Sequence, residues 1–162
     1  MNGNLSLLIA AFFPVVAAPV AWAVGRKDGQ KSIAAMVGFT AVELAMLLIL
    51  AFTGMGRELT IDGFIGMGLR MKADGFRVLY ASIACVMWLV TSIFGRDYLK
   101  HDHAPGRYAL FTLLTQGATV GLFLADSLFT AFCFFEVMSM ASYPWVAHEE
   151  EPEAMRAAET YL

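Results

Sequence analysis

Five long runs of apolar residues restrict this chain to one class of fold. They cover approximately residues 5–24, 33–53, 76–95, 107–125 and 128–147. The hydrocarbon core of a bilayer is about 30 Å thick and is crossed by about 20 helical residues, which matches the length of each run. Because lipid offers no hydrogen bonds, each run must satisfy its own backbone polar groups as a helix. The sequence therefore predicts an all-α, polytopic bundle of about five transmembrane helices.

The composition agrees with a membrane protein and excludes several other classes. Of the 162 residues, 59% are hydrophobic and 15% are charged, whereas a soluble domain has about 45–50% apolar residues. The formal net charge of −3 leaves no basic surface for nucleic acid. No Lys or Arg precedes Arg26, so the first run lacks the basic start of a secretory signal and is interpreted as a retained helix. Cys85 and Cys133 lie in apolar runs without disulfide or metal spacing.

The basic residues predict how the helices are oriented. With the N-terminus outside, seven basic residues fall on the cytoplasmic side and three on the other: Arg26, Lys27, Lys31, Arg96, Lys100, Arg107 and Arg156 against Arg57, Arg70 and Lys72. The excess of positive charge on cytoplasmic loops favours this orientation. Because the connections are too short for a soluble domain, residues 1–162 are interpreted as a single transmembrane domain.

The connections carry local signals of their own. Asp126 and Ser127 separate the fourth and fifth runs, and this polar pair suits a tight turn with a helix N-cap between antiparallel helices. Residues 57–75 alternate apolar and polar positions, which leaves two alternatives, a short hairpin or an interfacial segment. Pro152 suits the start of a sixth helix. Because no cap closes that helix, we expect the chain to be the N-terminal part of a larger bundle or a split subunit.

Two acidic residues lie inside apolar runs, Glu43 in the second and Glu136 in the fifth. A charge at the bilayer centre costs roughly 2.5–3.5 kcal/mol on insertion scales, so such a residue is a functional candidate. Ser139 and Tyr143 share the helix face of Glu136, which predicts a polar stripe for proton transfer. Glu43 has only Thr40 beside it, and a structural role is an equal alternative. No lysine occurs in the five runs, so a basic partner must come from outside this chain.

Two further residues of the fourth and fifth runs are ambiguous. Pro144 has no N–H for the carbonyl of Met140, so we expect a helix kink that loosens the backbone there. The alternative is that a proline so near a helix end only tilts the helix. Gln116 either lines the same proton path as Glu136 or takes part in close helix packing with Gly117 and Gly121, which are spaced as small-xxx-small.

The histidines favour proton transfer over metal binding. An imidazole titrates near neutral pH, so His148 at the end of the fifth run is a candidate proton acceptor, with an ordinary interfacial histidine as the alternative. Residues 96–107 include His101, His103, Asp97 and Asp102. A metal site needs convergent ligands, and topology alone already predicts a charged connection here. No metal site is therefore predicted, and no sequence motif indicates a cofactor.

The second half of the chain resembles the antiporter-like subunits of respiratory complex I, Mrp-type sodium/proton antiporters and membrane-bound hydrogenases. The resemblance is carried by residues 107–162: the Asp126–Ser127 turn, Phe135–Glu136 followed by Ser139, Ser142 and Tyr143, and the Pro152–Glu153–Ala154 helix start. The stretch GMGLRMKADGFRVLYASI also resembles the family's approach to its third helix, which extends the match to about residue 66.

The resemblance implies a larger bundle in which the glutamate matching Glu136 pairs with a lysine of a later helix to drive proton transfer. It also implies other membrane subunits as partners and the inner (cytoplasmic) membrane of a prokaryote. Redox chemistry of the NADH dehydrogenase or hydrogenase kind would belong to partner subunits, so the chain is not expected to be an enzyme alone. The alternative function is a non-conducting structural subunit that docks or spaces other subunits. The transported ion, proton or sodium, stays open.

Overall fold

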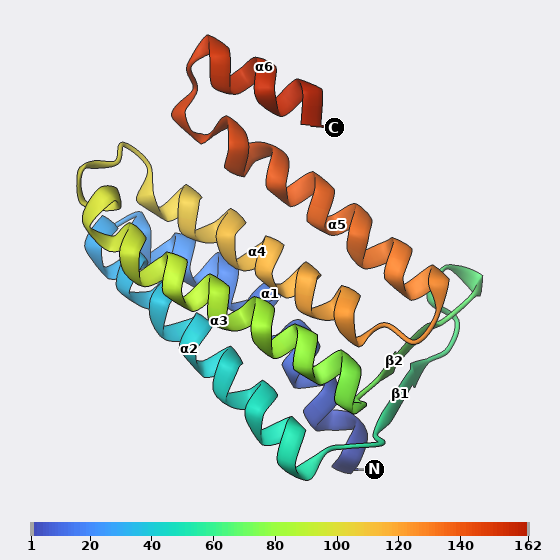
Figure 1. The fold of residues 1–162 in the computed structure, drawn as a ribbon. Helices are drawn as coiled ribbons and strands as arrows, with labels where there is room; N and C mark the ends of the chain where they lie inside the picture. Colours follow the sequence, from blue (N-terminus) through green and yellow to red (C-terminus); the bar gives the residue numbers. More distant parts are fainter. Residues whose placement is uncertain (1, 162) are drawn as a thin grey trace.

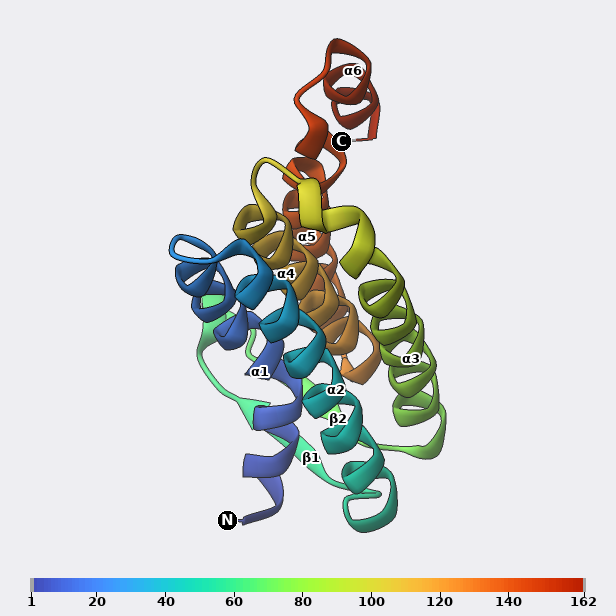
Figure 2. The ribbon, with the colours of Figure 1, turned by 90° about the vertical axis from the view of Figure 1, so that its left-hand side faces the viewer.

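The computed structural model describes residues 2–161, with the side chains of residues 5–100 and 102–160. Its helices are α1 (Asn2–Gly25), α2 (Gly29–Thr53), α3 (Gly75–Tyr98), α4 (Pro105–Leu124), α5 (Leu128–Val146) and α6 (Pro152–Tyr161). Two strands, β1 (Glu58–Ile61) and β2 (Leu69–Lys72), and three short 3-10 turns, η1 (Phe64–Gly66), η2 (Leu99–His101) and η3 (Ala147–Glu149), complete the fold. Helix α4 contacts each of α1, α2, α3 and α5, and α6 turns back beside the end of α5 (Figure 1, Figure 2).

Three of the described helices are long and apolar enough to cross a membrane: Leu5–Gly25, Gly29–Thr53 and Gly75–Tyr98. Helices α4 and α5, with 20 and 19 residues, are nearly as long, but their polar side chains lower the mean hydropathy. The structure thus confirms a helical bundle with several apolar spans. The span count of five and the outside N-terminus stay predictions.

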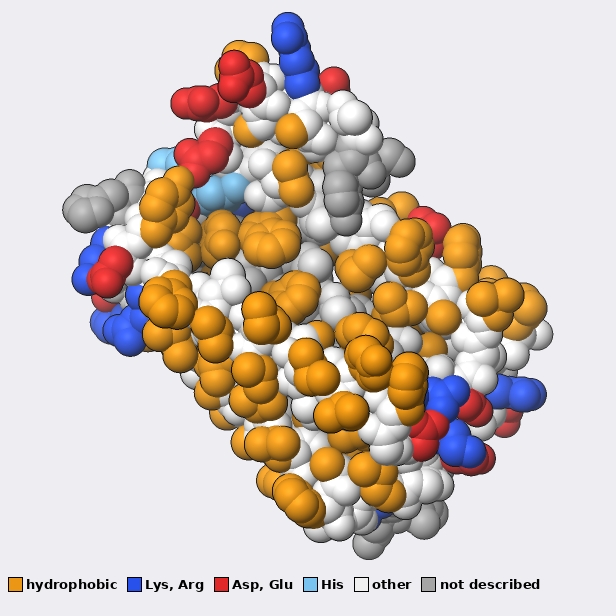
Figure 3. All heavy atoms as spheres, in the orientation of Figure 1, with side chains coloured by type: hydrophobic (Ala, Val, Ile, Leu, Met, Phe, Trp, Pro, Cys, Tyr) orange, Lys and Arg blue, Asp and Glu red, His pale blue; other side chains and the backbone are white. Residues whose placement is uncertain are grey.

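Charged side chains gather mainly towards the ends of the bundle, and apolar side chains cover much of the length between them (Figure 3). The α1–α2, α3–α4 and α5–α6 connections lie at one end, and the strands and the α4–α5 turn lie at the other (Figure 1). Many large apolar side chains are exposed in between, for example Val16, Ile83 and Met87. A wide exposed apolar surface between two charged ends is the distribution that a bilayer requires.

The segment after α2 is a β-hairpin, which confirms the first alternative for residues 57–75. Strands β1 and β2 pair antiparallel, with Leu59 opposite Met71, and both side chains are buried against the helices. Gly63 and Gly68 have positive φ, 79° and 76°, which glycine adopts without steric cost and which lets the chain turn back. The all-α expectation was wrong in this one respect, because a short strand finds its partner across the turn.

The α4–α5 turn has the predicted cap and an additional clamp. Ser127 is extended, and its Oγ accepts the N–H of Thr130 at 3.1 Å, which confirms the N-cap of α5. From α3, the Arg77 Nε donates to the carbonyl oxygen of Ala125 at 3.0 Å, and Nη2 pairs with Asp126 at 2.7 Å. The antiparallel helix pair and the helix start at Pro152 are both confirmed.

Replacing Ser127 with Ala is expected to lower the free energy of unfolding by about 1 kcal/mol, because the Thr130 N–H loses its acceptor. Chemical unfolding of the purified protein in detergent measures this change. Ser82→Ala is the matched control, since the Ser82 Oγ only donates to the Val78 carbonyl within α3, at 2.7 Å. An equal loss in both variants would argue against a capping role.

Candidate functional site

Glu136 lies on an apolar stripe of α5. Its side chain is partly buried, and no side chain or backbone group among the described residues forms a hydrogen bond or ion pair with its carboxylate. Phe132 and Met140, one turn before and one turn after, are 57% and 69% exposed and share its helix face. Within the described part of the chain, this stripe therefore presents an unpaired acid among uncovered apolar side chains.

The polar neighbours expected around Glu136 lie further along α5. Ser139 and Tyr143 are partly buried, and neither hydroxyl is hydrogen-bonded to another described residue. Tyr143 and Pro144 line a pocket of about 420 Å³ with Arg107, Ala147, Glu150 and Met155. Helix α5 continues through Pro144 to Val146 before the 3-10 turn η3. The kink and the proton path along this stripe stay predictions.

Glu43 belongs to a separate polar group inside the bundle, between α2, α3 and α4. Its side chain is 0% exposed, and neither carboxylate oxygen has a hydrogen-bond partner among the described residues. One turn earlier, the Thr40 Oγ1 donates to the Gln116 Oε1 at 3.0 Å, and the Gln116 Nε2 lies 3.3 Å from the Cys85 Sγ. Burying an unpaired, ionised carboxylate costs free energy, and buried charges in proteins are normally paired. Glu43 is therefore an exception that calls for a functional explanation.

Gln116 is hydrogen-bonded inside the bundle, towards α2 and α3. Both of its side-chain hydrogen bonds are to α2 and α3, and no hydrogen bond within the described residues joins it to Glu136. The neighbouring glycines serve close packing, as one alternative predicted. A Cβ at Gly117 would lie 2.8 Å from the Val15 Cγ2 of α1, and one at Gly121 would overlap the ring of Phe134.

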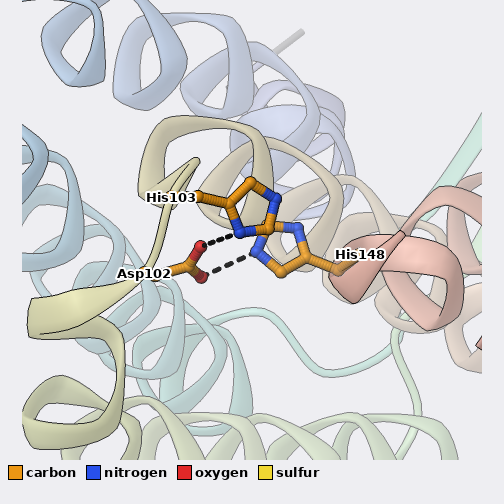
Figure 4. Close-up of side chains that lie close together, drawn as sticks. All are labelled: Asp102, His103 and His148. Carbon is orange, nitrogen blue, oxygen red and sulfur yellow. Dashed lines mark hydrogen bonds and ion pairs between the residues drawn. The ribbon is translucent and has the colours of Figure 1, made fainter. Parts of the chain in front are cut away.

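A third group, formed by Asp102, His103 and His148, lies at the end of the bundle (Figure 4). The Asp102 Oδ2 is 2.7 Å from the His148 Nε2, and Oδ1 is 3.2 Å from the His103 Nδ1. The two imidazole rings stack with their centroids 5.1 Å apart. The Arg107 Nη2 donates to the carbonyl oxygen of His148 at 2.8 Å, and the guanidinium pairs with Glu150. These contacts join the α3–α4 connection to the α5–α6 connection.

The convergence of these three residues is not predicted from the sequence. His148 is only 5% exposed and is paired with Asp102. Residues 96–107 show no convergent ligands by themselves, because the third side chain of the group lies 46 residues beyond Asp102. The only signal in the sequence is that both segments are predicted to lie on the same side of the membrane.

Electrostatics keep the Asp102 carboxyl ionised. Burial raises its pKa, but the backbone N–H of Ala104 and the nearby His148 and His103 lower it more, so the pKa lies below its ordinary value. The negative carboxylate can then hold both imidazoles in one orientation. The Nδ1 of His148 is buried and has no hydrogen-bond partner among the described residues.

Comparison with known proteins agrees with the resemblance seen in the sequence. No family model matches the chain. The chain is similar to proteins described as "Putative antiporter subunit mnhD2" from Staphylococcus aureus strains JH9, Newman and JH1, each 24% identical over 165 aligned residues. These alignments cover 100% of this chain and 33% of each relative, so the chain spans about one third of the length of the curated relatives it matches. The chain is thus similar, over its whole length, to part of an antiporter subunit, and its long apolar helices agree with a multi-pass membrane protein.

Proposed function

We propose that this chain is a membrane subunit of an ion-translocating complex of the complex I, Mrp or membrane-bound hydrogenase type, with Glu136 as its proton-binding carboxylate. The observation that carries the proposal is the unpaired acid on the apolar stripe of α5. An ionised carboxylate that faces lipid costs free energy. One that pairs with a positively charged side chain of a neighbouring helix is tolerated. The similarity to antiporter subunits, of which the chain spans 33%, supports further helices that cover this stripe.

Glu136 needs a cationic partner that the apolar runs of this chain do not contain. They hold no lysine. Arg77 at the start of α3 is engaged by Asp74, Asp126 and the Ala125 carbonyl, and Arg107 at the start of α4 is engaged by Glu150 and the His148 carbonyl. A nearby positive charge favours the ionised carboxylate, and its withdrawal favours the protonated form. We therefore assign the partner to a lysine of a later helix or of another subunit, whose movement makes Glu136 bind and release a proton. Ser139 and Tyr143 would hold water beside it.

Glu43 is the second proton-binding carboxyl in this proposal, with Gln116 as its polar neighbour. Its two unpaired oxygens support the assignment, because a purely structural acid is expected to be hydrogen-bonded. The Glu43 side chain is fully buried by the described residues, so its burial needs no residue from elsewhere. Glu136, by contrast, depends on a partner elsewhere.

Replacing Glu43 with Leu is expected to raise the free energy of unfolding by about 1–3 kcal/mol and to lower transport. The gain in stability arises because an unsatisfied buried polar group is removed. Unfolding in detergent and transport in vesicles measure the two effects. Glu43→Gln, which keeps the shape but cannot exchange a proton, is expected to lower transport without the same gain. A destabilised Leu variant with normal transport would show that Glu43 has a structural role instead.

The proposed function is tested on the native complex, isolated in mild detergent and reconstituted into vesicles. We expect ion transport together with apolar helices that carry lysines, either in a longer form of this 17.7 kDa chain or in a copurifying subunit identified by mass spectrometry. In a prokaryote we expect the complex in the inner membrane, with any redox centre in partner subunits. A complex without lysine-bearing helices, or without transport, would contradict the proposal.

A different observation favours the alternative function, a non-conducting subunit that docks or spaces others. The close approach of α4 to α1 at Gly117 and to α5 at Gly121 makes a rigid scaffold. If scaffolding is the whole function, the complex keeps its transport activity when Glu136 loses its charge. Transport by a Glu136→Gln complex therefore separates the two functions.

A further inference from the structure

We propose that Asp102, His103 and His148 bind a divalent transition-metal ion, with Zn²⁺ as the probe. Each residue offers one ligand atom, and these atoms all lie within 4.8 Å of one another. Figure 4 shows the three side chains meeting from two separate connections. Two imidazoles and a carboxylate are typical ligands of Zn²⁺, and such a mixed nitrogen and oxygen set suits Zn²⁺ better than Mg²⁺ or Ca²⁺. The site does not depend on the proposed transport function.

The ligand atoms can reach the spacing of a zinc site by a small movement of their side chains. Ligands about 2.0–2.1 Å from one tetrahedral ion stand about 3.3 Å apart. The His103 Nδ1 is already 3.2 Å from the Asp102 Oδ1. The His148 Nε2 contacts the other oxygen of the same carboxylate, Oδ2, at 2.7 Å. One ligand oxygen cannot keep both contacts, so the three ligand atoms, which now lie within 4.8 Å of one another, must settle about 3.3 Å apart when an ion replaces the shared proton. A rearrangement of that size lies within the reach of side-chain motion.

The site is open on one side and has room for a fourth ligand. Tyr98, Asp102, His103 and Glu149 line a cavity of about 260 Å³. The Tyr98 hydroxyl donates to the Glu149 Oε1 at 3.0 Å, which holds that carboxylate at the rim. The cavity can admit the ion from solvent and can hold water or the Glu149 carboxylate as a further ligand. His103, with half of its side chain exposed, forms the entrance.

The charge around the site favours a cation. Three carboxylates lie at the site, those of Asp102, Glu149 and Glu150. Among the described groups in contact with them, the guanidinium of Arg107 is the one fixed positive charge. The net charge is therefore −2 when the imidazoles are neutral. Arg107 Nη2 lies 3.1 Å from the His103 Nε2. A metal on the His103 Nδ1 leaves the ring proton on Nε2, which then cannot accept a hydrogen bond from Arg107. We therefore expect Arg107 to lose its contact with His103 on metal binding and to retain those with Glu150 and the His148 carbonyl.

The test is a titration of the purified full-length protein with Zn²⁺ by calorimetry, and with Co²⁺ by visible absorption. We expect one bound ion per chain, a tetrahedral Co²⁺ spectrum, and at least about a tenfold loss of affinity in His103→Ala. The control is Asp97→Asn, an exposed carboxylate at the same end that pairs with Lys100 and lies outside the group. Its affinity is expected to equal that of the wild type.

A second readout covers both histidine variants, of which His148→Ala removes a buried side chain. Zn²⁺ is expected to raise the thermal unfolding midpoint of the wild type, because an ion that binds only the folded state stabilises it. The midpoints of His103→Ala and His148→Ala, measured first without metal to establish that they fold, are expected to rise less than that of the wild type at the same Zn²⁺ concentration. The proposal is overturned if the wild type shows no saturable binding, or if His103→Ala and Asp97→Asn bind Zn²⁺ equally well.

Discussion

Glu136→Gln is expected to abolish ion transport by the assembled complex while leaving its assembly intact. The amide has nearly the shape of the carboxyl group but cannot bind and release a proton. Since the side chain is only partly buried and has no partner among the described residues, the fold should tolerate the change. We expect transport to fall about a hundredfold or more, the scale on which a lost proton-transfer group acts. Acidification of reconstituted vesicles, followed with a pH-sensitive dye, measures the rate.

The control for this experiment is Glu153→Gln, an exposed glutamate in the first turn of α6. It removes the same charge at the end of the bundle, where a solvated carboxylate has no expected part in transport. Equal subunit composition of the three complexes on a native gel shows that assembly is unchanged. Wild-type transport by Glu136→Gln would reject the proton-binding role and favour the scaffolding alternative.

Gly117→Leu is expected to lower the free energy of unfolding by about 1–3 kcal/mol, and to impair assembly. Even a Cβ at this position would lie 2.8 Å from the Val15 Cγ2 and 3.1 Å from the Val15 backbone nitrogen. The side chain could rotate away, but the backbone of α1 can move only if the two helices separate. Overpacking of a well-packed contact carries a penalty of this size. Unfolding of the purified chain in detergent measures it.

Gly38→Leu is the matched control, because Gly38 is also helical, but it is exposed on α2, and a Cβ added there would have no heavy atom of another described residue within 4 Å. Leu favours a helix over Gly by up to about 1 kcal/mol, so stability should be unchanged or slightly higher. Similar destabilisation in both variants would mean that any leucine added to a helix of this protein, and not the α1–α4 contact, sets the cost. A comparison of Gly117→Leu with Glu136→Gln separates assembly from transport, because only Gly117→Leu should reduce assembly.

The features that are predicted correctly from the sequence are local ones. The Ser127 cap and the helix start at Pro152 depend on interactions between residues a few positions apart, which can be read along the chain. The two acids in apolar runs are likewise visible, because the membrane penalty for a charge depends on its position in the run. The hairpin is only one of two alternatives, because residues 57–75 are too few for their alternation to distinguish a strand pair from an interfacial segment.

Local sequence signals are sufficient to predict a bundle of apolar helices, its turns and the presence of Glu43 and Glu136 within it. Which of these residues meet depends on how whole helices pack. The helices are apolar on nearly every face, so no periodic stripe indicates which side packs inward. Packing therefore joins Gln116 to Thr40, one turn before Glu43, and it brings Asp102 to His148 of another connection. Pairs so distant along the chain leave no local pattern, and only the tertiary structure reveals them.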